Sequence, residues 1–247
     1  MKVSTDGLVI WETKTGEADR VVTLLTPEGM ISVYARGSRR PNNKLTSPTS
    51  MLSYSNFELY TGTNMYTASD AMIKERFVTL FSDMHKYSLA IYFCELLKNL
   101  SPIEDDAGEY LSLILNTLHL LNTSDKDILL IKAVFELRIM SISGYMPSLD
   151  SCCECGTEID TVLSFDMQNG VWYCKECASG TNHSINASGA VLNAMRYIVS
   201  SDPQRIFSFS LTGEALKTLG KLTSLFTLIH IDKTLATLDF LNNILEL

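Results

Sequence analysis

The sequence predicts an α+β protein in which a small five-stranded barrel precedes a helical domain that carries a cysteine-rich insert. Two observations predict the barrel and the helices: strand-like runs fill the first 80 residues, and apolar residues recur at helical spacing after Arg76. A third observation, two closely spaced cysteine pairs between residues 152 and 177, marks the insert. We expect a barrel domain at 1–80 and a helical domain at 81–247, with the insert at about 150–180.

The strand-like runs are short, and turn residues separate them. Pro27-Glu28-Gly29 lies between the second and third runs, where proline and glycine supply the fixed and positive φ angles of a turn. The five runs are residues 7–13, 20–26, 30–36, 54–60 and 65–73. Five strands in fewer than 80 residues suggest a small barrel, for which the OB-fold is the five-stranded candidate. The pattern alone leaves another small barrel equally open.

Beyond Arg76, the sequence has the periodicity of amphipathic helices. Apolar residues recur at helical spacing from Leu89 to Leu100, and Ser101-Pro102 is expected to end that helix. A later helix is expected to open at 124–127 and to close at Ser143-Gly144. The other helical runs are residues 110–121, 188–200, 212–230 and 233–247. The second domain is therefore expected to be helical, interrupted by the insert.

The insert has the spacing of a metal site. Cys152 and Cys155, then Cys174 and Cys177, form two C-x₂-C pairs with eighteen residues between them. Each pair places two thiolates on one tight turn, about 2.3 Å from a shared ion, and two such turns complete the tetrahedron that Zn²⁺ prefers. Residues 163–173 are expected to form a short hairpin between them. Four thiolates leave no coordination position for water, so the sequence predicts a structural four-cysteine zinc finger and no catalytic metal.

The remaining cysteines leave one alternative open. Cys153 could replace Cys152 as a ligand, although the two-residue spacing favours Cys152. Cys94 lies in an amphipathic helix and is expected to be a small core residue. A redox-active dithiol is a weaker alternative, because it usually needs only one C-x-x-C motif and an activating environment. A zinc deaminase is excluded, because the sequence has no H-x-E motif.

The net charge of −8 at first opposes nucleic-acid binding, but the charges are unevenly distributed. Residues 1–80 carry nine Lys/Arg and eight Asp/Glu, whereas the remainder carries eleven and twenty. No acid lies between Glu28 and Glu58, and four cations cluster there: Arg36, Arg39, Arg40 and Lys44. A polyanion responds to the potential within roughly 10 Å, so these cations are candidate contacts for DNA phosphates. A merely solvated turn is the alternative.

Three tyrosines are candidates for stacking on DNA bases, namely Tyr34, Tyr60 and Tyr66. Their alternative role is packing in the barrel or across its strands. The sequence contains no recognisable Ser/His/Asp or Cys/His arrangement and no GxxxxGK[ST] nucleotide loop. It also contains no apolar stretch long enough to cross a membrane and no secretory signal. We therefore expect a cytoplasmic, nucleoid-associated protein that is not an enzyme and has no membrane partner.

Three ordered segments resemble the RecO family of bacterial recombination mediators. Gly7–Gly29 resembles its first two strands, Ala35–Leu45 its basic loop, and Gly144–Gly156 followed by Phe165–Cys177 its zinc segment. The resemblance covers nearly the whole chain and is weak beyond about residue 180. It implies an N-terminal OB-fold that holds DNA phosphates through Arg36, Arg39, Arg40 and Lys44. It also implies zinc held by Cys152, Cys155, Cys174 and Cys177.

The resemblance further implies a function and partners. Members of the family bind single- and double-stranded DNA and anneal complementary strands. Together with RecR, they displace single-stranded-DNA-binding protein so that RecA can load. The expected function is therefore that of a DNA repair and recombination mediator. The main alternative is a zinc-containing protein–protein adaptor without annealing activity, and an enzyme with an unrecognised site is a third.

Overall fold

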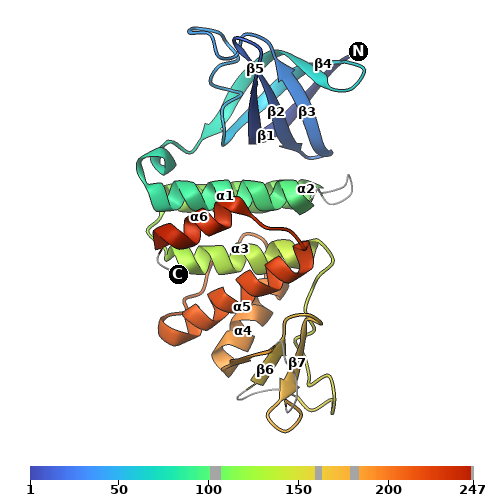
Figure 1. Cartoon of the computed structure of the whole chain (residues 1–247), viewed down its shortest axis with the longest axis vertical. Helices are drawn as coiled ribbons and strands as arrows, with labels where there is room; N and C mark the ends of the chain where they lie inside the picture. The colour runs from blue at the N-terminus through green and yellow to red at the C-terminus, as the bar shows by residue number, and fades with distance from the viewer. Residues whose placement is uncertain (101–106, 159–162, 179–183, 246–247) are drawn as a thin grey trace. The chain divides into compact units, whose positions relative to one another are not determined.

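The computed structural model describes residues 1–100, 107–158, 163–178 and 184–245 (Figure 1). The chain forms two compact units: Met1–Ser124 joined by Leu235–Leu247, and Asp125–Thr234. The first unit contains a barrel and helices, and the second contains helices and a small sheet. The helix end expected at Ser101-Pro102 lies outside the described residues.

A closed barrel with the strand order β1-β2-β3-β5-β4 fills the first part of the chain. Its strands are β1 (Lys2–Thr15), β2 (Asp19–Thr26), β3 (Gly29–Ala35), β4 (Ser53–Thr61) and β5 (Tyr66–Arg76). A parallel contact between β3 and β5 closes the ring, and all other neighbours are antiparallel. The prediction of a five-stranded OB-type barrel is confirmed, in preference to another small barrel.

β1 is longer than the sequence pattern predicts, because it pairs with two strands. Its first half, from Lys2 to Leu8, lies against β4, and its second half, from Leu8 to Thr15, lies against β2. A shift in register between Val9 and Trp11 bends the strand between these two partners. Residues 2–6 of β1 are mostly polar and do not alternate between apolar and polar side chains. Their pairing with β4 is what makes them part of the strand.

The barrel core consists of alternating side chains from every strand. Nine buried residues form it: Val9, Val22, Leu24, Val33, Ala35, Leu45, Phe57, Leu59 and Ala68. Leu45 belongs to the long connection between β3 and β4, so this connection is anchored in the core. The same connection carries the predicted basic loop, so the loop is held to the barrel at Leu45.

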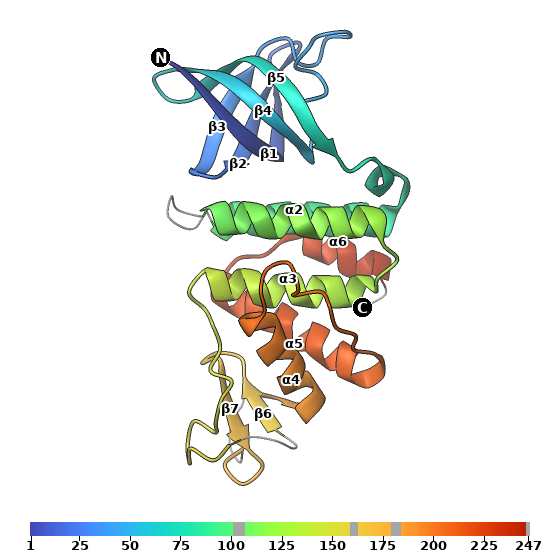
Figure 2. The same ribbon diagram turned by 180° about the vertical axis from the view of Figure 1, so that it is seen from behind.

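Three helices complete the first unit: α1 (Met84–Leu100), α2 (Ala107–Thr123) and α6 (Ala236–Leu245), with a short 3-10 helix η1 (Val78–Ser82) before them. α6 is the last helix of the chain, yet it packs against α1 (Figures 1 and 2). The backbone N–H of Thr237 donates a 3.0 Å hydrogen bond to the Glu95 carboxylate of α1. Within the described ranges, none of the helices has the length and apolarity that a membrane crossing requires.

The second unit contains α3 (Ile128–Ile142), α4 (Gly189–Ser200) and α5 (Gly213–Ile231). α3 begins where the sequence predicts, since the Asp127 side chain caps it by accepting the Leu129 N–H at 2.8 Å. α3 is buried almost all round and contains the ion pair of Lys132 with Glu136, at 2.7 Å. Hydroxyl groups of α5 complete this pair, including Thr223 Oγ1, which donates to Glu136 at 2.8 Å.

A three-stranded sheet in the order β7-β6-β8 lies in the second unit. β6 (Leu163–Asp166) and β7 (Val171–Cys174) form the predicted hairpin, and β8 (Ser184–Ala187) is a third strand that the sequence analysis missed. Phe165 of β6 packs on Trp172 of β7 and on Phe226 of α5, with ring centroids 4.8 and 5.8 Å away. The insert is thus tied to a helix by aromatic packing as well as by its cysteines.

Candidate metal centre and nucleic-acid interface

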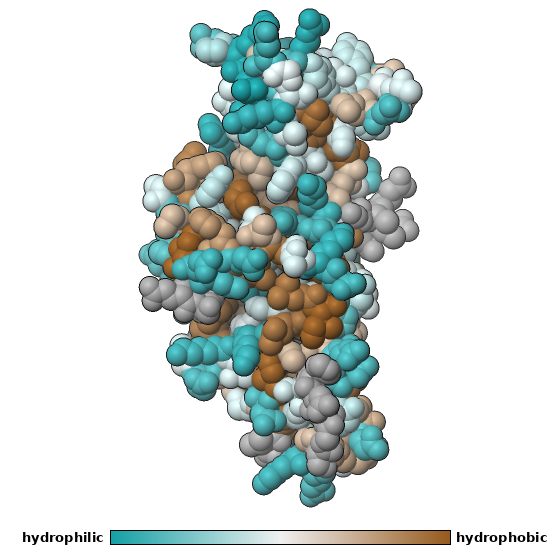
Figure 3. Space-filling model, in the orientation of Figure 1, coloured by the Kyte–Doolittle hydropathy of each residue, from teal (hydrophilic) through white to brown (hydrophobic). Residues whose placement is uncertain are grey.

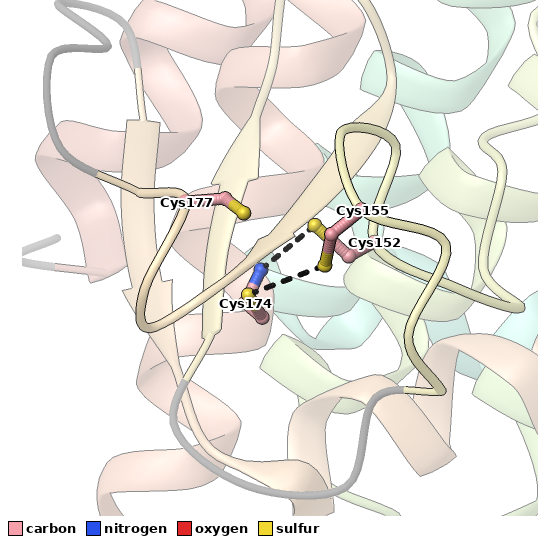
Figure 4. Close-up of side chains that lie close together, drawn as sticks. All are labelled: Cys152, Cys155, Cys174 and Cys177. Carbon is pink, nitrogen blue, oxygen red and sulfur yellow. Dashed lines mark hydrogen bonds between the residues drawn. The ribbon is translucent and has the colours of Figure 1, made fainter.

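Four cysteines from two turns converge at one point of the insert (Figure 4). Cys152 and Cys155 belong to a turn in which the Gly156 N–H bonds the Cys152 carbonyl at 2.9 Å. Cys174 ends β7, and Cys177 follows in a turn whose backbone N–H bonds the Cys174 carbonyl at 3.1 Å. The four Sγ atoms all lie within 4.8 Å of one another.

The spacing of these sulfur atoms fits a tetrahedral ion. Thiolates bound about 2.3 Å from a central Zn²⁺ lie roughly 3.8 Å apart along each edge of the tetrahedron. Cys155 Sγ and Cys174 Sγ are 3.8 Å apart. The donor set is thus suited to a thiophilic divalent ion, and it leaves no position for a substrate or an activated water.

The surroundings of the sulfurs favour the deprotonated form of two of them. Burial raises the pKa of Cys152, but backbone N–H groups of Cys155, Cys174 and Glu154 outweigh it and bring the pKa to about 6. Hydrogen bonds from Thr157 lower the pKa of Cys155. The pKa of Cys177 is raised, because its thiol shares a hydrogen bond with Cys174. Metal binding is therefore accompanied by release of protons from the thiols, and deprotonation is easiest at Cys152.

The structure separates Cys152 from its neighbour Cys153. Cys152 is 1% exposed and belongs to the cluster, whereas Cys153 is exposed and lies outside it. The nearby Cys153 thiol instead raises the pKa of the Tyr173 phenol to about 12. Cys94 is buried in α1, and burial raises the pKa of its thiol to about 12, as for an inert core residue.

The predicted basic loop borders an open groove on the barrel, with a volume of about 720 Å³. We call it the cationic groove, and its lining includes Asp19, Arg36, Arg40, Lys44 and Ser69. Arg39 is exposed beside the groove and does not line it. Hydrophilic side chains gather over this end of the barrel in Figure 3. The four predicted cations thus share one exposed region, three of them in a common groove.

Carboxylates that the acid-free stretch of sequence did not reveal lie in the same region: Glu17 and Asp19 line the groove, and Asp70 lies beside it. Asp70 of β5 forms a 3.0 Å ion pair with Lys44, in which both side chains are more than half exposed. Asp19 accepts hydrogen bonds from the Tyr34 hydroxyl and, at 2.6 Å, from the Gly37 N–H, and these bonds lower its pKa. In the described part of the chain, Arg36, Arg39 and Arg40 have no carboxylate within ion-pair distance. The positive excess therefore rests on these three arginines.

The three candidate stacking tyrosines have different surroundings. Tyr34 holds Asp19 through its hydroxyl, so it organises the cationic groove. Tyr60 is 51% exposed at the end of β4. Tyr66 is half-buried and packs against the barrel core at the start of β5. Of the three, Tyr34 is the one whose hydroxyl bonds a residue of the cationic groove. Tyr60 and Tyr66 therefore remain the better candidates for stacking on a base.

Arg20 is a positioning residue that the sequence analysis missed. Its Nη1 donates to the carbonyls of Ser38 and Thr46, at 3.2 and 2.9 Å, and to Thr49 Oγ1 at 3.3 Å. Its Nε lies 3.4 Å from the Glu12 carboxylate. One guanidinium therefore ties both ends of the basic loop to β1 and β2. Its place in the sequence, beside Asp19 at the start of the predicted strand 20–26, is the signal that could have pointed to it.

We expect Arg20→Met to lower the free energy of unfolding by about 2–3 kcal/mol, because a largely buried charged donor loses several acceptors at once. Urea unfolding followed by circular dichroism measures the change. A Glu12→Gln, Arg20→Met double variant is the control, and it should recover part of the loss, since no unpaired carboxylate is left behind. A change below about 0.5 kcal/mol in the single variant would contradict this role.

These features define the class of protein: an OB-fold barrel with a cationic groove, followed by a helical region with a four-cysteine insert. Family models then identify the family. The model described as "Recombination protein O N terminal" matches residues 1–77, and "Recombination protein O C terminal" matches residues 81–239. The chain belongs to the RecO family of DNA repair and recombination proteins.

Full-length relatives agree with this assignment. The DNA repair protein RecO of Acetivibrio thermocellus is 32% identical over 98% of this chain and 97% of the relative. The DNA repair protein RecO of Symbiobacterium thermophilum is 30% identical over 98% and 97% of the two chains. The protein of the same name from Alkaliphilus metalliredigens is 28% identical over 94% and 95%. The similarity thus extends over the barrel, the helices and the cysteine insert together.

Proposed function

We propose that this protein is a non-catalytic recombination mediator that binds single- and double-stranded DNA and anneals complementary strands. Together with RecR, it helps to load RecA on DNA coated by single-stranded-DNA-binding protein. It acts in the cytoplasm, associated with the nucleoid. The observation that carries the proposal is the cationic groove on the barrel: Arg36 and Arg40 in it, and Arg39 beside it, are exposed and have no ion-pair partner among the described residues. Membership of the RecO family supports the choice of partners.

The charge distribution suits strand annealing. A mediator has to neutralise two strands enough for them to meet, yet it must release the product. A small patch formed by Arg36, Arg39, Arg40 and Lys44, on a chain with a net charge of −8, gives modest affinity, fast exchange and strong salt dependence. The carboxylates of Asp19 and Asp70 within the same region limit the affinity further. Tight binding that is independent of salt would contradict this mechanism.

We assign DNA contact to a barrel domain at residues 1–80 and a structural role to the insert in a helical domain at 81–247. Cys152, Cys155, Cys174 and Cys177 would hold a Zn²⁺ ion, which supplies cross-linking of the two cysteine turns and no chemistry. The sulfur spacing and the number of donors support zinc. The ion's function is to fix the insert, because a complete set of thiolates offers nothing to a phosphate group.

Annealing of complementary oligonucleotides, followed by fluorescence at low salt, tests the proposed function. Intact protein should accelerate annealing of naked strands and of strands coated with single-stranded-DNA-binding protein, and the acceleration should fade as salt rises. The coated strands distinguish a mediator from a simple polycation. If neither kind of strand anneals faster, a protein–protein adaptor becomes the better interpretation of the same fold.

A further inference from the structure

A second groove lies on the barrel, outside the four predicted cations. The first half of β3 forms one wall, at Met30, Ile31 and Ser32, and the connection from Thr61 to Tyr66 forms the other. Its volume is about 370 Å³. The groove exists because β3 and β5 pair only at Val33 with Tyr66 and at Tyr34 with Thr67. The preceding residues of β3 have no registered partner on β5 within the described barrel, so a gap is left there.

The walls of this groove suit a flat, uncharged ligand. They contain neither an acidic nor a basic side chain. Tyr66 is partly buried and packs against the barrel core, and Met65 beside it is 40% exposed. Hydroxyl and amide groups of Ser32, Thr63 and Asn64 surround this apolar surface with donors and acceptors. A nucleobase has this combination of a π-face and a polar edge, and stacking on an aromatic ring is tolerant of sequence.

The second groove continues the cationic groove along the same pair of strands. The cationic groove begins where β3 ends, at Arg36, and is lined by Ser69 of β5. The second groove is lined by Tyr66 of β5 and by β3 up to Ser32. Only the three residues 33–35 of β3 separate the two, which is about 10 Å of strand. A cationic surface next to an uncharged aromatic one matches the alternation of phosphate and base along a single strand.

We propose that the groove at Met65 and Tyr66 is a nucleobase subsite for single-stranded DNA, which rests on the proposed DNA-binding function. A base packs on the Tyr66 ring and the Met65 thioether while neighbouring phosphates lie in the cationic groove. Paired bases are not accessible to such a site, so it favours single strands over duplex. The subsite holds only a few bases, so the rest of the strand stays free to pair with its complement. The duplex product is then released.

The test compares two oligonucleotides with the same phosphates, one of thymidines and one with abasic sites in place of every base. Fluorescence anisotropy at 50 mM salt measures the affinity of each. Intact protein should bind the thymidine strand about tenfold more tightly, as one stacked base contributes. Tyr66→Leu should remove most of this ratio while leaving the abasic affinity and its salt dependence unchanged. Tyr66→Phe keeps the ring and should keep the ratio.

Met65→Ser is a second variant, chosen because Met65 is partly exposed and its replacement leaves the barrel core intact. It should reduce the ratio at least threefold, so the proposal can be tested even where Tyr66→Leu does not fold. If the intact protein binds both strands equally, the subsite is refuted and the proposed function is unaffected. The same conclusion follows if the affinity ratio is unchanged in both variants. An intact protein that binds neither strand overturns the proposed function and the subsite together.

Discussion

Replacing Arg36, Arg39 and Arg40 together with alanine should weaken binding of single-stranded DNA roughly 500-fold at 50 mM salt, and annealing should disappear with it. Four phosphate contacts predict a log–log salt slope of about −3, whereas a single remaining contact predicts about −0.7. Plots of log affinity against log salt concentration for the two proteins converge near 1 M salt. The difference between their slopes therefore sets the loss of affinity at 50 mM salt. The intact protein should lose roughly fifty-fold in affinity between 50 and 200 mM salt, and the variant only about threefold.

The matched control removes the same amount of charge from another part of the chain. Lys217, Lys221 and Lys233 are exposed in the second unit, and their replacement with alanine changes the net charge equally. This control variant should anneal like the intact protein. Equal losses in both variants would show that total charge governs binding and the groove does not. Annealing that survives the arginine changes would move the DNA contact away from the barrel.

Lys44 should contribute less than each arginine. It already pairs with Asp70, so a phosphate has to compete with that carboxylate before it gains the lysine. The salt slope of the intact protein is therefore expected to lie on the shallow side of −3. In the described part of the chain, the three arginines have no carboxylate within ion-pair distance, and Asp19 acts on Arg36 and Arg40 only at longer range.

Cys174→Ser should abolish binding of zinc and unfold the two cysteine turns. Metal coordination at four-thiolate sites contributes on the order of 10 kcal/mol to local folding at neutral pH, and three ligands retain only part of it. Without the ion, the two cysteine turns lose the cross-link between them. Metal content after gel filtration measures the first effect, and amide hydrogen exchange over residues 150–158 and 172–178 measures the second.

Cys153→Ser is the control for this prediction, because Cys153 is adjacent to the cluster and outside it. Its metal content and exchange pattern should match those of the intact protein. Amide protection of the barrel should persist in both variants, since its core contains no residue of the insert. Retention of a full equivalent of metal by Cys174→Ser would refute the assigned ligand set. Loss of metal in Cys153→Ser would make this thiol a candidate ligand again.

Part of the metal site could be predicted from spacing alone, because the two C-x₂-C turns are local structures. Each turn depends on a few neighbouring residues, such as Gly156 with its φ of +70°. The choice between Cys152 and Cys153 was open in the sequence, since both precede Cys155 in the same turn. The structure places the buried Cys152 in the cluster and leaves Cys153 exposed, with its thiol near Tyr173 of β7. That contact joins residues twenty apart, which no local pattern records.

By itself, the sequence determined the barrel strands, the main helices, the cysteine pairs and the basic loop. Each of these follows from periodicity, turn residues or charge within a short window, where local physical preferences act. Only the tertiary structure decided that Asp19 and Asp70 stand beside the basic loop, that Arg20 ties it down, and that α6 returns to α1. These arrangements bring together residues far apart in the chain. They depend on which apolar faces and buried polar groups find partners when the whole chain packs, so they are properties of the folded molecule.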